Sequence, residues 1–378
     1  MPDVVIVGAG PVGMLLAAEL SRSGVEVLVL ERRTEAGAGS RAIGIHAPVL
    51  TALESSGITD ELLENAQRVW RGEARSRGKR LGLVNFDRSR SRFGFVATLP
   101  QAATEQVLAS RAPTPLRGAH VVGLKPDESG VRVRSRIEGR ITESRSPLVV
   151  VASGSSGRDL VFRRRAISTR IYRDRYVMTD AVAGPFADPQ TAVVHLDSSG
   201  VLESFPLPDG FRRYVAWDDE LPDDATARVS RLRQVVASRE GAESASAVET
   251  ATSFGVRRFV ASHLRHGRLF VIGDAAHEVS PIGGQGMNLG LLDAATLAPL
   301  LTQWVRSGAA PEDELERWER RRVTSARRAA ALASMNTRLG RPLHPAADQV
   351  RRAAVSTMLS RTGNLFAHAY SMGLDKDA

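Results

Sequence analysis

The chain contains no cysteine among its 378 residues. That absence excludes disulfide bonds, thiolate metal ligands, iron–sulfur clusters and a cysteine nucleophile, and we predict no metal site. No apolar run reaches the roughly 18 residues of a membrane span, so we expect no contact with a membrane. The first strand-like run begins at Val4, which leaves no room for the basic and apolar regions of a signal peptide. We therefore expect a cytoplasmic protein.

Lysine and aromatic residues are also scarce. Three of the 51 basic residues are lysines, aromatic residues make up 5% of the chain, and the formal net charge is +9. A platform that stacks nucleic-acid bases needs aromatic side chains interleaved with basic ones, and the arginine-rich stretches 68–92, 132–145 and 163–175 lack that pattern. We therefore expect no nucleic-acid partner. The arginines indicate a solvated basic surface, which could attract an anionic substrate, a nicotinamide dinucleotide or an acidic carrier protein.

A βαβ unit with a glycine-rich turn is predicted at the start of the chain. Residues 4–7 form an unbroken β-branched run, typical of a parallel strand buried on both faces. The turn Gly8-Ala9-Gly10-Pro11-Val12-Gly13 leads into a helical pattern over 14–23 and a second strand over 25–30 that ends at Glu31. In this motif the first glycine makes a tight turn, the second lets the backbone approach a pyrophosphate, and the third allows close helix–strand packing. The unit predicts a site for FAD or NAD(P), with Glu31 on a ribose.

A second glycine-rich helix start lies far downstream. The predicted strand 269–272 delivers Asp274 to its carboxyl end, where open α/β sheets bind their ligands. The segment Pro281-Ile282-Gly283-Gly284-Gln285-Gly286-Met287-Asn288 then opens a long helical pattern. Its backbone N–H groups suit an electron-rich group such as the N1/C2-carbonyl edge of a flavin, which an NAD(P) site alone would not need. The second motif therefore favours FAD.

With these segments the chain resembles the FAD-dependent aromatic hydroxylases of the p-hydroxybenzoate hydroxylase type, which are single-component flavoprotein monooxygenases. The run from Gly273-Asp274-Ala275-Ala276-His277 to Asp293 is similar to that family's second FAD signature almost residue for residue. Ser40-Arg41-Ala42-Ile43-Gly44-Ile45-His46 and residues 99–108 are similar to two further family segments. The resemblance extends to about Pro342. It implies an α/β fold with a Rossmann-like FAD-binding domain, an inserted smaller β-sheet substrate domain and C-terminal helices.

The resemblance also implies a set of cofactor contacts. Glu31 would bind the adenosine ribose, Asp274 the ribityl hydroxyls, and Pro281 would lie beside the reactive face of the flavin. Asp274 by itself also fits a helix N-cap, and His277 fits a packed or capping residue as well as a general base. The residues expected to bind FAD are Gly8, Gly10, Pro11, Val12, Gly13, Glu31, Arg32, Arg41, Gln101, Gly273, Asp274, Pro281, Gly284, Gly286, Met287 and Asn288.

The resemblance further implies a reaction. Reduced FAD would react with O2 to give a C4a-hydroperoxide, which hydroxylates an aromatic or polyketide-like small molecule or attacks a ketone in a Baeyer–Villiger variant. NAD(P)H is the possible reductant. One segment departs from the family: after the strand 148–151 an Asp-Gly pair, a Ser and an Arg are replaced by Ser153-Gly154, Gly157 and Leu160. The lost charges favour, as an alternative, an FAD enzyme of the same fold without NAD(P)H-driven turnover, such as a cyclase.

The length predicts about two domains at roughly 150 residues each. The turns expected at 197–200 and 206–210, and the strand expected at 211–217, indicate a sheet inserted into the cofactor fold. The expected division is an FAD-binding domain (1–70, 96–165 and 256–340), a substrate domain (71–95 and 166–255) and a C-terminal helical segment (341–378).

The substrate pocket is expected between the inserted sheet and the flavin. Arg213, Tyr214, Trp217, Phe93 and Phe95 are candidates for its wall, although each also fits ordinary packing. No catalytic residue is assigned, and the candidates are Arg41, His46, Pro281, Arg213 and Tyr214.

A helical pattern over 346–374 ends the chain. Its apolar stripe of Val350, Ala354, Met358 and Leu359 fits packing on the cofactor domain or a dimer contact, which leaves monomer and homodimer open.

Overall fold

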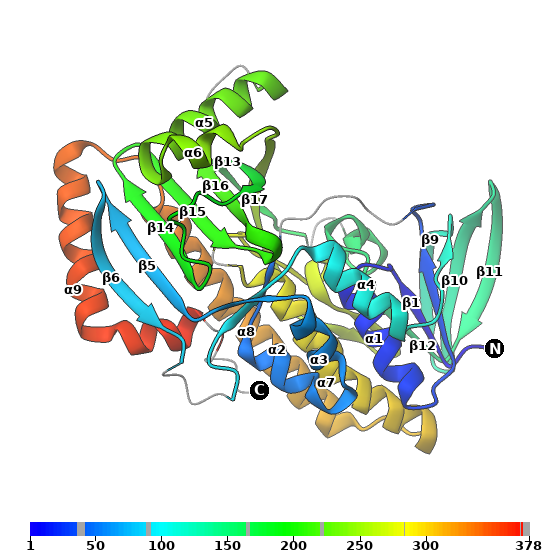
Figure 1. Cartoon of the computed structure of the whole chain (residues 1–378). Coiled ribbons are helices and arrows are strands. Elements are labelled where there is room, and N and C mark those ends of the chain that lie inside the picture. The colour runs from blue at the N-terminus through cyan, green and yellow to red at the C-terminus, as the bar shows by residue number, and fades with distance from the viewer. Residues whose placement is uncertain are drawn as a thin grey trace.

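A computed structural model describes residues 1–35, 42–87, 92–163, 167–219, 223–282, 284–370 and 372, and gives the backbone alone for 362–370. Figure 1 shows two large β-sheets side by side, with the long helices α7 (Gly286–Ser307) and α8 (Glu312–Leu339) connecting them. The two helices pack on each other, α7 also contacts helix α1 (Pro11–Arg22), and α8 contacts strand β17 (Thr252–Val260). The predicted α/β fold with an inserted sheet is confirmed.

The first sheet is mostly parallel and carries the glycine-rich turn. Its central strand β1 is paired in parallel with β12 and β2, and every residue of β1 and β12 is buried. Continuous β-branched runs suit strands covered on both faces. The strand order across this sheet is β18 (Arg265–His266), β19 (Leu269–Val271), β12 (Leu148–Val151), β1 (Val4–Val7), β2 (Val27–Glu31) and β8 (Leu116–Arg117).

Two boundaries of the βαβ unit differ from the sequence-based prediction. Helix α1 begins at Pro11 rather than at Met14, because proline is well suited to the first turn of a helix. Strand β2 begins at Val27 rather than at Val25, because the Val25 N–H donates to the Leu20 carbonyl and belongs to the turn that ends α1.

Two small antiparallel sheets and three helices complete this half of the molecule. The helices are α2 (Ala47–Ala52), α3 (Ile58–Glu64) and α4 (Gln101–Arg111). One small sheet contains β9 (His120–Asp127), β10 (Gly130–Ile137) and β11 (Arg140–Ser146), and the other contains β3 (Gly44–Ile45), β7 (Val96–Thr98) and β4 (Gln67–Val69).

The second large sheet has eight strands among the described residues. One face packs on α5 (Ala225–Glu240) and α6 (Ala242–Ser246), and α5 is capped by the Asp224 carboxylate, which accepts from the Ala227 N–H. The strand order is β20 (His277–Glu278), β17 (Thr252–Val260), β13 (Arg170–Val182), β16 (Phe211–Trp217), β15 (Gly200–Pro206), β14 (Thr191–Asp197), β5 (Arg71–Ser76) and β6 (Lys79–Asn85). The proposed domain boundaries stay a prediction.

The C-terminal helix α9 (Pro345–Tyr370) lies against β6 at the edge of the eight-stranded sheet (Figure 1). The expected packing on the cofactor domain is therefore wrong, and so is the expected stripe. Leu359 is buried, but Val350 is 70% exposed. The face of α9 that is buried is set by where the helix contacts β6. At that contact, a Cβ added at Gly82 would lie 2.5 Å from the Leu359 Cβ. Because the helix approaches so closely there, Val355 and Leu359 are buried against the sheet. The weakly amphipathic sequence of the helix does not specify which of its faces is buried.

Candidate cofactor and substrate site

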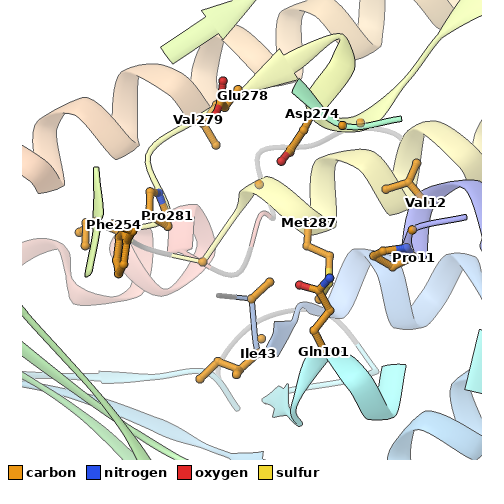
Figure 2. Close-up of a pocket in the computed structure, with 18 of the residues that line it drawn as sticks. Pro11, Val12, Ile43, Gln101, Phe254, Asp274, Glu278, Val279, Pro281 and Met287 are labelled. Atoms are coloured by element: carbon orange, nitrogen blue, oxygen red, sulfur yellow. The ribbon is translucent and has the colours of Figure 1, made fainter. Parts of the chain in front are cut away.

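A cavity of about 1400 Å³ extends from the carboxyl ends of β1, β2 and β12 to one face of the eight-stranded sheet. Pockets for drug-sized ligands occupy roughly 300–1,000 Å³, so this volume suits a large ligand together with a smaller one. Figure 2 shows Asp274, Pro281, Met287, Gln101 and the start of α1 around one part of it. We refer to the part between the two glycine-rich turns as the cofactor chamber and to the part along the eight-stranded sheet as the substrate chamber.

The first glycine-rich turn leaves space for a ligand at one position and none at two others. A Cβ on Gly10 would meet no atom within 4 Å, and Gly10 lines the cavity. A Cβ on Gly13 would lie 2.1 Å from the Gly8 carbonyl oxygen, and Gly8 has a φ of +112°. Pro11 and Val12 also line the cavity, whereas Gly13 is absent from the lining. The turn is thus a backbone cradle open at Gly10, the shape that a pyrophosphate requires.

Glu31 lies at the end of β2 and lines the cavity beside Arg32. Its carboxylate accepts hydrogen bonds from the backbone N–H groups of Ala9, at 2.8 Å, and Arg33, at 2.9 Å. Burial alone would raise the pKa of Glu31, but the hydrogen bonds from Arg33 and Ala9 outweigh it and the pKa is lowered. The group is therefore an ionised acceptor at neutral pH.

Asp274 faces the cavity from a 3-10 turn, η5 (Gly273–Ala275), and does not cap a helix. Arg158 reaches this turn from the segment after β12: its Nη2 donates to the Asp274 carbonyl at 2.8 Å and to a Glu278 carboxylate oxygen at 2.7 Å. The Arg158 guanidinium also lies over the Phe259 ring, 4.3 Å from its centroid. Sequence reasoning missed Arg158, because its partners are more than 100 residues away in the chain.

A buried ionic cluster also holds η5, the turn that carries Asp274. The Asp293 carboxylate accepts from the Gly273 N–H at 3.0 Å, from His277 Nε2 at 2.6 Å and from Arg322 Nε at 2.8 Å. Burial would raise the pKa of Asp293, but His277 and Arg322 outweigh it and lower the pKa. His277 is 1% exposed and is therefore a packed residue, one of the two roles that its sequence position allowed.

The second glycine-rich turn lies across the cavity from α4. Gly284, Gly286 and Met287 line the cavity at the start of α7, and their contact with FAD stays a prediction. Asn288 does not line the cavity: its side chain is fully buried, accepts from the His46 N–H at 2.8 Å and donates to the Gly44 carbonyl at 2.8 Å. The Asn288 side-chain amide is thus engaged within the protein, and contact of this residue with FAD stays a prediction.

Two further residues of the predicted set border the cavity (Figure 2). These residues are Pro281 and Gln101, and the Gln101 side-chain amide donates to the Glu105 carboxylate at 2.7 Å. His46 also lines the cavity, where burial lowers its pKa to about 4 and keeps the ring neutral at pH 7. Arg41 lies outside the described residues.

Of the expected wall residues, Arg213 alone lines the substrate chamber. Its guanidinium pairs with both Asp180 carboxylate oxygens at 2.6 Å. Tyr214 faces α5 on the opposite side of the sheet, because successive side chains of a strand alternate; its expected place in the wall is wrong. Phe93 and Phe95 pack on each other, and Trp217 packs beside Gly200.

The sequence analysis also missed Glu203 on β15, which lines the substrate chamber and is 6% exposed. Burial raises the pKa of Glu203 to about 8. Within the described part of the chain, no residue is hydrogen-bonded or ion-paired with it. The sequence does place Val201, Glu203 and Phe205 on the same face of one strand, because side chains alternate between the two faces. It does not indicate which of the two faces borders a cavity.

We predict that Glu203→Gln removes a pH dependence of stability. The folded protein holds the Glu203 proton up to about pH 8, whereas the unfolded chain loses it near its ordinary pKa of about 4.5. The free energy of unfolding should therefore fall as pH rises from about 4.5 to 8, by at most about 1.4 kcal/mol per pH unit. Urea unfolding of both proteins at pH 5, 6.5 and 8 measures this. An unchanged difference between them across the range would contradict the prediction.

Residues 1–333 match the family described as FAD binding domain. The chain belongs to this flavoprotein family. A rifampicin monooxygenase from Streptomyces venezuelae is 32% identical over 85% of this chain and 68% of the relative. A 6-methylpretetramide 4-monooxygenase from Streptomyces rimosus is 32% identical over 88% of this chain and 62% of the relative. The resemblance to p-hydroxybenzoate-hydroxylase-type monooxygenases is thereby confirmed, and this flavoprotein chain spans about two thirds of the length of these relatives.

Solved structures share the fold. A p-nitrophenol 4-monooxygenase from Pseudomonas putida aligns with a TM-score of 0.85 over 100% of this chain and 99% of that one, at 22% identity. A Diels-Alderase of pyrroindomycin biosynthesis aligns with a TM-score of 0.78 over 98% of this chain and 80% of that one, at 24% identity. At these identities the likeness concerns the fold alone.

The cofactor chamber of this flavoprotein fits FAD on its own geometry. The open cradle at Gly10 suits a pyrophosphate, the ionised Glu31 suits ribose hydroxyls, and the N-terminus of α7 at Gly286 suits an electron-rich ring edge. The described residues include no group of three or more His, Asp or Glu side chains arranged to hold a metal ion. In the same part of the chain, no helix combines the length and apolar character needed to cross a bilayer.

We predict that Arg158→Met weakens FAD binding about tenfold. Loss of the guanidinium removes charge-assisted hydrogen bonds that hold the Asp274 turn, and each is worth roughly 1.5–3 kcal/mol. Titration of the apoprotein with FAD, followed by flavin fluorescence, measures the affinity. Arg163→Met, at a nearby exposed position, serves as the matched control. Equal affinity in both variants would show that the turn is held without Arg158.

Proposed function

We propose that this flavoprotein is an FAD-dependent monooxygenase that uses O2 and NAD(P)H to hydroxylate an aromatic or polyketide-like small molecule. The observation that carries the proposal is the continuity of the cavity from the glycine cradle, past Asp274 and Pro281, to a largely apolar sheet face. One cavity therefore offers a dinucleotide site and, beside its inner end, a chamber for an apolar substrate. The monooxygenase names of the relatives support the same reaction class.

The residues of the chain have three tasks in this proposal. FAD, when bound, supplies the activation of O2 by a reduced flavin. The backbone N–H groups at Gly286 and Met287, at the N-terminus of α7, would hold the flavin ring of FAD and would stabilise negative charge on it. The apolar wall of the eight-stranded sheet would exclude water from the reacting groups, and Pro281 lines the same cavity. The neutral His46 adds no charge there.

An anaerobic titration with NADH and NADPH tests the proposal. We expect a yellow protein whose visible flavin band bleaches with one of the two nicotinamides and recovers with air. Phenols added during the same titration should then increase oxygen consumption. A colourless protein that takes up no added FAD would rule out the whole proposal.

The second candidate is an FAD enzyme without redox turnover, such as a cyclase. It is favoured by the replacement of the family's Asp and Arg by Ser153 and Leu160. Arg158 is a charged residue in this segment, but its guanidinium binds the Asp274 carbonyl and the Glu278 carboxylate. A protein that stays yellow with both nicotinamides yet bleaches with dithionite would support this candidate, or a separate reductase.

We further propose that the protein acts in the cytoplasm without a nucleic-acid partner, as a monomer or homodimer. Gel filtration with light scattering distinguishes the two oligomeric states. Retention on DNA at low salt that persists at 0.5 M salt would contradict the proposed absence of a nucleic-acid partner, because non-specific binding by arginines falls steeply with salt.

A further inference from the structure

We propose that Glu203 is the specificity-determining residue of the substrate chamber, and that it binds a hydroxyl group of an uncharged, largely apolar aromatic substrate. The inference rests on the proposed function in assuming that the chamber receives a substrate. It goes further in assigning a residue and a chemical class to that substrate.

The position of Glu203 within the sheet is the first argument. Its cross-strand neighbours are Val194 on β14 and Val215 on β16, and both line the cavity with it. Phe205, two residues along the same strand, lines the cavity as well. A carboxyl group among apolar side chains costs stability unless it gains a hydrogen bond. Such a group is retained where a ligand completes the bond, so we infer a ligand with a polar group at this point of the wall.

The charges around Glu203 are the second argument. Arg213 on β16 is neutralised by Asp180, and Glu73 on β5 is paired with Arg75. Tyr176 on β13 is a buried phenol whose pKa is raised by burial and by the charges of Asp174 and Glu203. Arg257 lies on β17, three strands from β15, so the two backbones are separated by at least about 14 Å across the strands. Arg341, whose charge also acts on Tyr176, is paired with Asp174. The described cations around Glu203 are therefore paired with a carboxylate or lie strands away, and an ionised Glu203 would repel a carboxylate substrate.

A hydroxyl group satisfies these conditions. At neutral pH the Glu203 carboxyl is mostly protonated, so it can both donate to a hydroxyl oxygen and accept from a hydroxyl proton. When Glu203 is ionised, it accepts from the hydroxyl in a stronger, charge-assisted bond. Because the charge-assisted bond is the stronger one, we expect binding of a hydroxyl donor to favour the ionised form and to release protons near pH 8. Binding of a carboxylate must favour the protonated form and take up protons.

The test is calorimetric titration of the FAD-loaded protein at pH 8 in two buffers that differ in ionisation enthalpy. The probes are 2-naphthol, 2-naphthoate and 2-methoxynaphthalene, which share a ring body and differ in the polar group. The proteins are wild type, Glu203→Gln, Glu203→Leu and the exposed control Glu249→Gln. Thermal melts of each variant confirm folding before titration.

We expect wild type and Glu249→Gln to release up to about half a proton for each 2-naphthol bound, and Glu203→Gln to release none. Glu203→Leu should bind 2-naphthol about tenfold more weakly, whereas its affinity for 2-methoxynaphthalene should change little. Wild type should bind 2-naphthoate more weakly than 2-naphthol, with proton uptake. Equal 2-naphthol affinity and equal proton release in wild type and both Glu203 variants would overturn the inference. Failure of FAD loading would instead reject the proposed function, so the two failures are distinguishable.

Discussion

Gly13→Ala should reduce the affinity for FAD by more than a hundredfold and should also destabilise the apoprotein. The added methyl group would lie 2.1 Å from the Gly8 carbonyl oxygen, a distance that backbone atoms do not tolerate. Helix α1 must then move away from β1, which opens the cradle and separates the helix N-terminus from the phosphates. Fluorescence titration with FAD measures the affinity, and thermal unfolding of the apoprotein measures the stability.

Gly10→Ala in the same turn separates the two effects. Its methyl group meets no protein atom within 4 Å, so the apoprotein should melt like wild type while FAD binding weakens. Gly123→Ala, at a strand position with ordinary space and φ, should change neither quantity. If Gly10→Ala bound FAD normally, the ligand would not approach the backbone there, and our placement of the pyrophosphate would be wrong.

Asp293→Ala should lower the free energy of unfolding by about 3–5 kcal/mol. The substitution leaves the Arg322 guanidinium fully buried without its carboxylate and removes the acceptor of the Gly273 N–H. An uncompensated buried charge accounts for most of that loss. Urea unfolding at pH 7 measures the effect. FAD affinity should fall as well, because the Gly273 N–H no longer fixes the turn that carries Asp274.

The double variant Asp293→Leu with Arg322→Met provides the control for charge. Replacement of both members of a buried ion pair by apolar residues of similar volume often restores stability, so this variant should recover most of the lost free energy. Glu314→Ala breaks the exposed pair with Arg317 and should cost less than about 1 kcal/mol. A double variant as unstable as Asp293→Ala would show that packing, rather than the unpaired charge, causes the loss.

The features that were predictable from sequence depend on local patterns. The βαβ unit, the cradle and the turn at Asp274 follow from strand periodicity, glycine spacing and the order of motifs, and the family match agrees with them. Arg158 was not predictable, because its partners Asp274 and Glu278 become neighbours only when β12 and β19 pair. The same holds for Arg322, which meets Asp293 through the packing of α8 on α7.

The errors on the substrate side have a common physical origin. Alternation along β16 shows that Arg213 and Tyr214 point to opposite faces, but the sequence does not say which face borders the cavity. The inward face of α9 is set by its close approach to Gly82, not by a clear apolar stripe. Both choices depend on which element covers a sheet face, which is a property of the tertiary structure.

The place of α9 in the chain has a consequence for synthesis on the ribosome. Val355, Met358 and Leu359 of α9 line the substrate chamber, whereas the turns of the cofactor chamber are complete by residue 288 and their ionic support by Arg322. Translation therefore delivers every part of the cofactor chamber before the helix that closes the substrate chamber. We expect FAD bound at that stage to stabilise the part of the protein already made, while the apolar sheet face that α9 covers is still exposed.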